Sequence, residues 1–534
     1  MSSSTPRVRV VISSAVTSLV LPLTLAAAVT AQGPADVLRF YETPARGIAL
    51  VDGNGTIVHE WRTGFLRNGA YEILQDGTLV HKGPTGVRGL GFDGSLRWTY
   101  TPPPGLVQHH DMEPLANGNV LFIARESKTR AEAIARGRNP YTVGPFLEFG
   151  VLIEVKPTGP TSGDIVWEWH VWDHLIQDFD PAQENYGVVA DHPERIDINY
   201  PAVPFAGVEF NHLNGLDVEP GREWIALTSP THDEVWIIDH STTTAEAAGS
   251  SGGRAGKGGD LLYRWGNPAV YQAAPAAAKQ LDFVHDPRFI PPDYPGAGNL
   301  TLFNNGITAV ASEALEIVLP VDELGRFERS NGGAFGPRGP VWSYSSPGFV
   351  SFVKSSAERL PNGNTLICSG RQAWVFEVTP AGQIAWEQRY TTPGFEIFHA
   401  HHTRRSLWAS AEAVAASAGM TVQFDFAAGS PWGGSPYVVL GSASGTSPGT
   451  PLAGTLLRLN QDLYFRSIVS VAGSGLFASW VGTLDAAGTA QATLALPAMP
   501  AAAVAGVHLH HAVLTVNSAG LGWGSNAVPL RLTP

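Results

Sequence analysis

The chain has 534 residues, including 59 glycines, 40 prolines and 15 tryptophans, and its 34 basic and 47 acidic side chains give a formal net charge of −13. This acidic balance disfavours nucleic-acid binding, which needs a basic face. The single cysteine, Cys368, excludes an intramolecular disulfide and a cysteine-based zinc site. Because 44% of the residues are hydrophobic and turn formers abound, the composition predicts a soluble, β-dominated protein with a large core.

Residues 1–31 are predicted to be a secretory signal peptide. Arg7 and Arg9 precede an apolar or small-residue run over 10–28, and small residues follow at 29–31, as a cleavage site requires. The alternative is a membrane anchor, although serine and threonine dilute the apolar run. No later segment is apolar enough to span a bilayer. We therefore expect an exported protein, periplasmic or extracellular, with no membrane span after cleavage.

A short strand that closes on aromatic residues recurs along the chain, each time after a turn. The copies lie at residues 56–61, 95–100, 164–169, 260–265, 340–344 and 383–387. Near-copies of a second element, a hairpin with an Asn-Gly or Asp-Gly turn, lie at residues 74–79, 115–121 and 360–366. A third strand lies at 151–155 and at 235–239. Together these elements define a repeating unit of four antiparallel strands.

Six such units predict an all-β fold, a six-bladed β-propeller over residues 40–410. In the first unit, residues 47–51 and 57–61 supply only the outer pair of strands, whereas residues 395–408 are left over after the last unit. The simplest solution is one split blade that both ends of the repeat region close. The alternative is a pair of β-sandwiches with fortuitous aromatic strand ends.

The composition and the residue pattern of the sequence change after residue 411. An alanine-rich run leads into alternating strands, such as residues 421–426, and into turn-rich segments. Residues 419–534 are predicted to form a separate β-sandwich-like domain. Because this region has few charges and no cluster of histidines with acids, we expect an accessory role for it.

Histidines recur at the start of the predicted inner strands. His110, His212 and His285 occupy this place in three units, and His401 lies in the leftover segment. Inner strands of a propeller line its central channel, so these side chains are expected to converge. Such a cluster would bind a metal, perform nucleophilic and acid–base chemistry, or bind an anion. The structural alternative is that each imidazole satisfies a buried carbonyl.

Two further features near these histidines have two interpretations each. Asp111 and Asp286 directly follow two of the histidines, either to orient an imidazole or to cap a turn. A basic stretch, Arg125 to Arg138, is predicted to be solvated surface, with a channel lid as the alternative.

Several segments resemble bacterial arylsulfate sulfotransferases, with a match over roughly residues 45–405. The matching segments are residues 109–112, 211–214, 237–247, 256–268 and 295–299. Members of this family are exported six-bladed propellers that need no nucleotide sulfate donor. They transfer a sulfuryl group from a phenolic sulfate ester to a phenol in two displacement steps, through a transiently sulfated histidine.

The resemblance implies roles for individual residues. His285 matches the nucleophile, His212 and Asn214 match the His-x-Asn pair that contacts the sulfate, and His110 matches a histidine that helps to bind donor and acceptor. His109 and His401 are further candidates for substrate binding. The family also has an arginine shortly after the His-x-Asn strand, whereas residues 227–233 contain none, and His232 is the candidate substitute.

Imidazoles and an amide can hold the three oxygens of a sulfuryl group, and a phenolate leaves readily, so the chemistry needs no metal or other cofactor. The expected partners are an aryl sulfate donor and a phenolic acceptor. A sulfatase that uses water is a close variant. A secreted, non-catalytic propeller that binds an anionic or aromatic ligand is the main alternative, and a metal-dependent lyase or hydrolase is a third.

Overall fold

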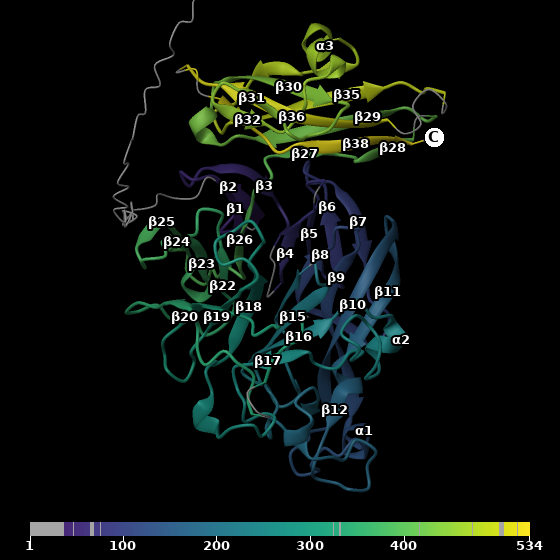
Figure 1. Cartoon of the computed structure of the whole chain (residues 1–534), viewed down its shortest axis with the longest axis vertical. Coiled ribbons are helices and arrows are strands. Elements are labelled where there is room, and N and C mark those ends of the chain that lie inside the picture. The colour runs from purple at the N-terminus through teal and green to yellow at the C-terminus, as the bar shows by residue number, and fades with distance from the viewer. Residues whose placement is uncertain are drawn as a thin grey trace, which may run out of the picture.

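The computed structural model describes residues 37–45, 47–64, 69–74, 76–219, 221–323, 325–329, 333–415, 417–472, 474–500, 507–518, 520 and 522–533. The predicted signal peptide lies outside these ranges. Within them, no helix combines the length and the apolar character needed to cross a membrane. Figure 1 shows two β-rich bodies stacked along the long axis of the molecule.

The larger body is a propeller of six blades, each a sheet of four antiparallel strands. The first blade, from its inner to its outer strand, consists of β26 (Ala400–Thr403), β1 (Leu38–Thr43), β2 (Gly47–Val51) and β3 (Ile57–Trp61). The second consists of β4 (Tyr71–Ile73), β5 (Leu79–Lys82), β6 (Val87–Leu90) and β7 (Leu96–Tyr100). The third consists of β8 (Leu106–Pro114), β9 (Val120–Thr129), β10 (Phe146–Gly159) and β11 (Ser162–His170).

The remaining three blades follow in the same order. The fourth consists of β14 (Gly215–Glu219), β15 (Trp224–Ser229), β16 (Glu234–Asp239) and β17 (Tyr263–Trp265). The fifth consists of β18 (Val284–Phe289), β19 (Leu300–Asn304), β20 (Glu313–Ile317) and β21 (Trp342–Tyr344). The sixth consists of β22 (Ser356–Arg359), β23 (Thr365–Ser369), β24 (Trp374–Val378) and β25 (Ile384–Arg389). The predicted six-bladed architecture is therefore confirmed.

The recurring aromatic strand is the outermost strand of every blade, and the structure explains its tryptophan. In five blades the indole Nε1 donates a hydrogen bond to a backbone carbonyl of the next blade, at 2.7–3.2 Å. These pairs are Trp61 with Gly91, Trp98 with Ser162, Trp169 with Gly259, Trp265 with Pro337, and Trp342 with Pro380. In the sixth blade, Trp386 instead lies under the Arg39 guanidinium of the first blade, 4.5 Å from ring centroid to Cζ. A tryptophan at this position therefore joins successive blades.

The first blade is split as predicted, but in a different proportion. Three of its strands come from the N-terminal segment, and only the innermost, β26, comes from the other end of the repeat region, where it pairs with β1. The prediction that the N-terminal segment supplies only the outer pair was wrong, because residues 38–43 form a fully buried strand that shows no polar alternation.

The smaller body is a β-sandwich, as predicted for the C-terminal region. One sheet has the strand order β27 (Leu407–Ala409), β29 (Met420–Ala427), β35 (Thr489–Leu496) and β33 (Phe477–Ala478). The other has the order β28 (Ala413–Ala415), β38 (Val528–Thr533), β36 (His508–Val516), β30 (Pro436–Ser442) and β34 (Val481–Thr483), with β37 (Gly522–Gly524) also paired to β36. A hairpin of β31 (Thr450–Leu452) and β32 (Thr455–Leu457) and the helix α3 (Leu463–Val471) complete the domain.

The domain boundary lies earlier in the chain than predicted. Because β27 and β28 already belong to the two sandwich sheets, the propeller ends with β26 at Thr403 and not at residue 410. Trp408 of β27 is fully buried and stacks on Phe92 of the second blade, with ring centroids 5.0 Å apart. The backbone N–H of Ser430 donates to the Asp52 carboxylate at 2.7 Å. The sandwich therefore packs on the first two blades, away from the long loops at the opposite end (Figure 1).

Those loops interrupt the third and fourth blades. The connection between β9 and β10 contains the helix α1 (Arg130–Ala135), and the connection between β16 and β17 contains α2 (Thr244–Ala247); each starts with a reciprocal Thr–Glu capping box. The connection from β11 to β14 is the longest and contains the parallel pair β12 (Leu175–Ile176) and β13 (Ile196–Asp197). This connection supplies Phe205, Glu209 and His212 to the site described next.

Candidate functional site

The predicted histidines lie where the inner strands are distorted. In the third blade the pairing of β8 with β9 is interrupted between Gln108 and Met112, and His110 has a φ of 47°. His212, just before β14, has a φ of 45°. Left-handed backbone is unfavourable for residues other than glycine, and residues that adopt it cluster at active sites and ligand-binding segments. The bulge turns the His109 and His110 side chains out of the regular strand alternation.

These distortions surround a cavity of about 520 Å³ at one mouth of the channel. It is lined by four histidines, two lysines, one arginine and three phenylalanines, together with two acids and a valine. The lining residues are Lys82, His109, His110, Arg125, Phe205, Glu209, His212, Phe283, His285, Val353, Lys354, Glu396 and Phe398. The structure therefore brings His109, His110, His212 and His285 together, as expected from their place in the repeat.

Two of the imidazoles contact each other directly. The Nε2 atoms of His110 and His212 lie 3.2 Å apart, although 102 residues separate them in sequence. The Nδ1 of His212 contacts the carboxylate of Glu209, and the Nδ1 of His109 lies 3.1 Å from the Leu213 carbonyl. The Glu209 carboxylate and the Leu213 carbonyl can only accept a hydrogen bond. His212 and His109 therefore carry their hydrogen on Nδ1, and the Nε2 of His212 presents a lone pair.

A side-chain amide holds the fourth imidazole. The Nδ2 of Asn305 donates to the carbonyls of Ser351 and Lys354 at 2.6 and 3.1 Å, which leaves its Oδ1 2.6 Å from Nδ1 of His285. An amide oxygen only accepts, so His285 carries its proton on Nδ1 and its lone pair on Nε2. The backbone N–H of Lys354 donates to this Nε2 at 3.2 Å.

Burial keeps the clustered imidazoles neutral. Desolvation lowers the pKa of His285 to about 4, although Asn305 and the Phe283 carbonyl oppose the shift. Desolvation, with His285 and Arg125 nearby, lowers the pKa of His212 to about 3. Burial also lowers the pKa values of His109 and His110 well below the usual range of histidine. At neutral pH the cavity therefore presents uncharged imidazoles, one of them a possible nucleophile.

The cavity also carries cations that were not predicted as site residues. Arg125 binds Glu148 at 2.8 Å and Glu209 at 2.6 Å. Lys354 pairs with Glu396 at 2.9 Å. Lys82 has no ion pair with any described carboxylate, and burial, together with Arg125, lowers its pKa. A lysine without a counter-ion on a cavity wall favours an anionic ligand.

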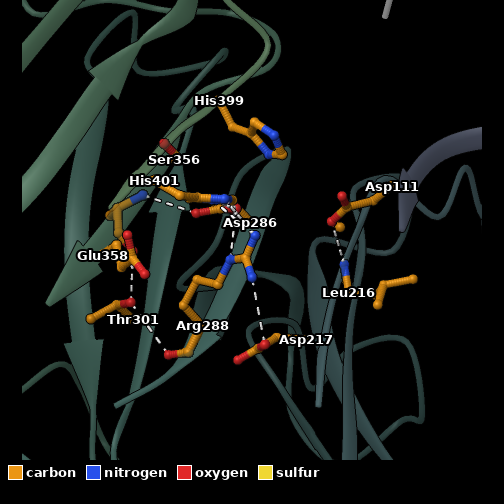
Figure 2. Close-up of polar contacts among 12 residues, drawn as sticks. Asp111, Leu216, Asp217, Asp286, Arg288, Thr301, Ser356, Glu358, His399 and His401 are labelled. Carbon is orange, nitrogen blue, oxygen red and sulfur yellow. Dashed lines mark hydrogen bonds and ion pairs between the residues drawn. The ribbon is translucent and has the colours of Figure 1, made fainter. Parts of the chain in front are cut away.

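Farther along the channel, a charged network fills the propeller axis (Figure 2). Arg288 of β18 donates to Glu72 at 2.6 Å and to Glu113 at 3.1 Å, and its Nη1 lies 3.6 Å from Asp217. His401 contacts Glu72 at 2.7 Å and Asp286 at 3.0 Å. Although burial and Arg288 oppose protonation, Glu72 and Asp286 raise the pKa of His401 to about 10.

His401 therefore belongs to this network and not to the cavity lining, which corrects its predicted substrate-binding role. Asn214 needs a similar correction. It is buried, its Nδ2 donates to the Val284 carbonyl at 3.2 Å, and its Oδ1 accepts from Thr228 at 2.6 Å. Both polar atoms of the Asn214 side chain are therefore engaged. Its hydrogen bond to Val284 holds the strand that carries His285, and Asn214 is not among the residues that line the main cavity.

The two aspartates that follow the histidines join neighbouring blades. Asp111 accepts the backbone N–H of Leu216 at 2.8 Å, as Figure 2 shows, and Asp286 accepts that of Ala357 at 3.1 Å. Asp286 also orients an imidazole, but that of His401 and not that of its neighbour His285. Each aspartate therefore serves mainly to hold the inner ring together.

His232 does not replace the missing arginine. Its ring is fully buried between Phe210, Trp236 and Tyr200, and its Nδ1 lies 2.9 Å from the Ser229 hydroxyl.

The prediction that the basic stretch, Arg125 to Arg138, is solvated surface was partly wrong. Arg125 lines the cavity, and Arg138 is fully buried with hydrogen bonds to four backbone carbonyls.

Among the residues that the structure describes, two groups of side chains have ligand atoms close enough to hold a metal ion. His109, His110 and His212 form one group, and Glu72, His399 and His401 form the other, each with one ligand atom per residue within 4.8 Å of the rest. Only the first group lines the cavity.

Comparison with known proteins adds little beyond the fold. No family model and no curated protein matches the chain. A structure of a protein of unknown function from Bacteroides caccae shares 12% identity at a TM-score of 0.39, over 69% of this chain and 99% of that one. Virginiamycin B lyase from Staphylococcus aureus shares 12% identity at a TM-score of 0.28, over 66% of this chain and 75% of the lyase. The Dos1 propeller shares 9% identity at a TM-score of 0.27, over 72% and 74% of the two chains.

These similarities concern the β-propeller fold alone. At such low identities, function has to be argued from the cavity itself.

Proposed function

We propose that the protein is an aryl-sulfate sulfotransferase that moves a sulfuryl group between phenols through a sulfated His285. The observation that supports this most is the tautomer of His285, because Asn305 leaves a neutral imidazole with its lone pair on Nε2 at the wall of the cavity. A neutral, buried imidazole is a competent nucleophile at neutral pH.

The rest of the cavity suits an aryl sulfate. Lys82 offers a charge that no described carboxylate balances, and it would attract the sulfate group. Phe205, Phe283 and Phe398 provide faces on which a phenyl ring can pack. No tryptophan or tyrosine is among the described lining residues, so these phenylalanines supply the aromatic faces of the cavity.

The proposed first step forms a bond between His285 Nε2 and sulfur as the bond from sulfur to the phenolic oxygen breaks. The leaving phenolate takes the electron pair of the broken bond, and the N–H that His110 directs towards His212 stabilises it by donating a hydrogen bond. The contact of the Lys354 N–H with Nε2, 3.2 Å long, has to open for this attack. In the second step, the incoming phenol gives its proton to the lone pair on Nε2 of His212, and its oxygen bonds to sulfur. The bond between nitrogen and sulfur breaks, its electron pair returns to His285, and the proton then passes to solvent.

One observation favours a second candidate, a non-catalytic propeller that binds an anionic aromatic ligand. The Lys354 amide already occupies the lone pair on which the proposed attack depends. Under this alternative, the cavity would bind an aryl sulfate and leave it intact.

The two candidates are separated by incubating the mature protein with 4-nitrophenyl sulfate, with and without phenol. The proposal predicts nitrophenolate release that depends on phenol and is lost in His285→Ala. It predicts normal release in His192→Ala, a control at a half-exposed histidine paired with Glu194. Release without phenol would indicate hydrolysis. Binding of the ester without release would favour the second candidate.

A further inference from the structure

We propose that His109, His110 and His212 form a binding site for a divalent transition metal ion of the zinc type, with an open coordination position facing the cavity. This inference goes beyond the proposed sulfuryl transfer and does not depend on it.

The distances between the rings fit such an ion. The Nε2 atoms of His110 and His212 lie 3.2 Å apart, and a tetrahedral zinc ion with bonds of 2.0–2.1 Å separates two nitrogen ligands by about 3.3 Å. The ring centroid of His212 lies 5.0 Å from those of both His109 and His110, at interplanar angles of 82° and 66°. The three rings thus surround one point from different directions.

The groups behind the rings also match a metal site. Metal-binding histidines usually donate their second ring N–H to a carboxylate or to a backbone carbonyl, which fixes the ring and strengthens the ligand. The Glu209 carboxylate accepts from Nδ1 of His212, and the Leu213 carbonyl accepts from Nδ1 of His109 at 3.1 Å. Both rings therefore direct their Nε2 lone pairs away from these acceptors.

Local charge does not prevent the binding of a cation. Arg125 lines the same cavity, and two carboxylates, Glu148 and Glu209, bind it. Lys354 is paired with Glu396. Lys82 alone keeps an unbalanced charge, so an anion bound between the metal ion and Lys82 would complete the coordination.

The choice of a transition metal follows from the ligands. Three imidazole nitrogens, with no carboxylate among the ligands, suit zinc, copper, nickel or iron, whereas calcium and magnesium prefer oxygen. Three protein ligands and an open fourth position are typical of catalytic and not structural zinc sites.

The second group of ligand atoms, Glu72, His399 and His401, is a poorer site. Both ring nitrogens of His401 already contact carboxylates, and Arg288 lies 2.7 Å from its Nδ1. A metal ion there would have to displace a buried guanidinium. Binding is therefore expected at the three-histidine site alone.

If the proposed function is correct, a metal ion and an aryl sulfate would compete for the cavity. The metal ion would occupy the Nε2 atoms of His110 and His212 that the sulfuryl transfer uses. Zinc would then inhibit nitrophenolate release and a chelator would restore it. The binding itself is measured without any substrate, so failure of the transfer leaves this test intact.

The test is isothermal titration of zinc chloride into chelator-treated mature protein from which any polyhistidine tag has been removed. We expect one ion per chain in the wild type and in His192→Ala. His212→Ala should lose the binding, and Glu209→Gln, which keeps all three ligands, should weaken it about 10- to 100-fold. Thermal unfolding without metal checks that each variant folds.

Cobalt provides a second measurement, because a tetrahedral Co²⁺ site absorbs visible light strongly. The proposal predicts this absorption in the wild type and its loss in His212→Ala. No binding, or binding unchanged in both His212→Ala and Glu209→Gln, would overturn the proposal. If His212→Ala does not fold, Glu209→Gln decides the question.

Discussion

Asn305 Oδ1 lies 2.6 Å from Nδ1 of His285, so a residue just after β19 fixes the ring of a residue in β18. The orientation of the amide is itself fixed, because its Nδ2 donates to the Ser351 and Lys354 carbonyls. This relationship gives His285 a single tautomer and directs its lone pair through Nε2, which makes Asn305 a positioning residue for the proposed nucleophile.

The first prediction concerns this contact. Asn305→Ala should slow the sulfation of His285 about 10- to 100-fold with a small change in KM, because the ring loses its orientation but the cavity keeps its cations. Asn305→Asp keeps an acceptor at Nδ1 and should restore part of the rate. Stopped-flow measurement of the first nitrophenolate turnover tests both variants. An unchanged rate in Asn305→Ala would contradict the positioning role.

The second prediction concerns pH. Burial lowers the pKa of His285 to about 4, so the nucleophile stays neutral well below the usual histidine pKa of about 6.5. The first-turnover rate should therefore remain high as the pH falls and decline only near pH 4. In Asn305→Asp the added carboxylate should move this decline to higher pH. An acid limb near pH 6.5 in the wild type would show that His285 is not held neutral.

The third prediction concerns the anion. Lys82→Met removes the cavity charge that no described carboxylate balances, so the Kd for an aryl sulfate should rise about tenfold or more. Lys156→Met, at an exposed lysine of β10, is the matched control and should bind normally. Titration of 4-nitrophenyl sulfate into His285→Ala measures this binding without turnover. Equal affinity in the two lysine variants would exclude Lys82 from the anion site.

The fourth prediction concerns the axial network. Arg288→Met removes the buried guanidinium that contacts Glu72, Asp286 and the neighbouring carboxylates and should lower the free energy of unfolding by about 3–5 kcal/mol. Arg326→Met removes an exposed i, i+4 pair with Asp322 and should cost less than about 1 kcal/mol. Urea unfolding compares the two. A small effect in Arg288→Met would mean that the network does not hold the inner strands.

Much of the fold was predictable because the repeat has a local signal. An Asn-Gly or Asp-Gly turn specifies the inner hairpin, and the outer-strand tryptophan recurs because its indole reaches the next blade in five of the six units. The strand β1 was missed because its side chains are buried throughout, so no alternation marks it.

The site was predictable only in part. His110, His212 and His285 share a place in the repeat, which brings them together whatever their separation in sequence. Lys82 and Arg125 do not stand at that place. Lys82 ends β5 and Arg125 lies in the middle of β9, each the second strand of its blade, yet both line the cavity. Glu209 belongs to a long connection whose path no periodic pattern specifies.

His401 illustrates the opposite error. Its position in the closing segment suggested a substrate contact, but buried carboxylates from other blades hold both of its nitrogens. Partners that lie 115 to 329 residues away in the chain cannot be read from local sequence.

Mass spectrometry of the protein, quenched during its reaction with 4-nitrophenyl sulfate in the absence of an acceptor, would detect the sulfated histidine itself. We expect one added sulfuryl group per chain, on the peptide that contains His285, and its disappearance when phenol is added. A stoichiometric sulfuryl group on any other residue, or none while nitrophenolate is released, would contradict His285 as the nucleophile.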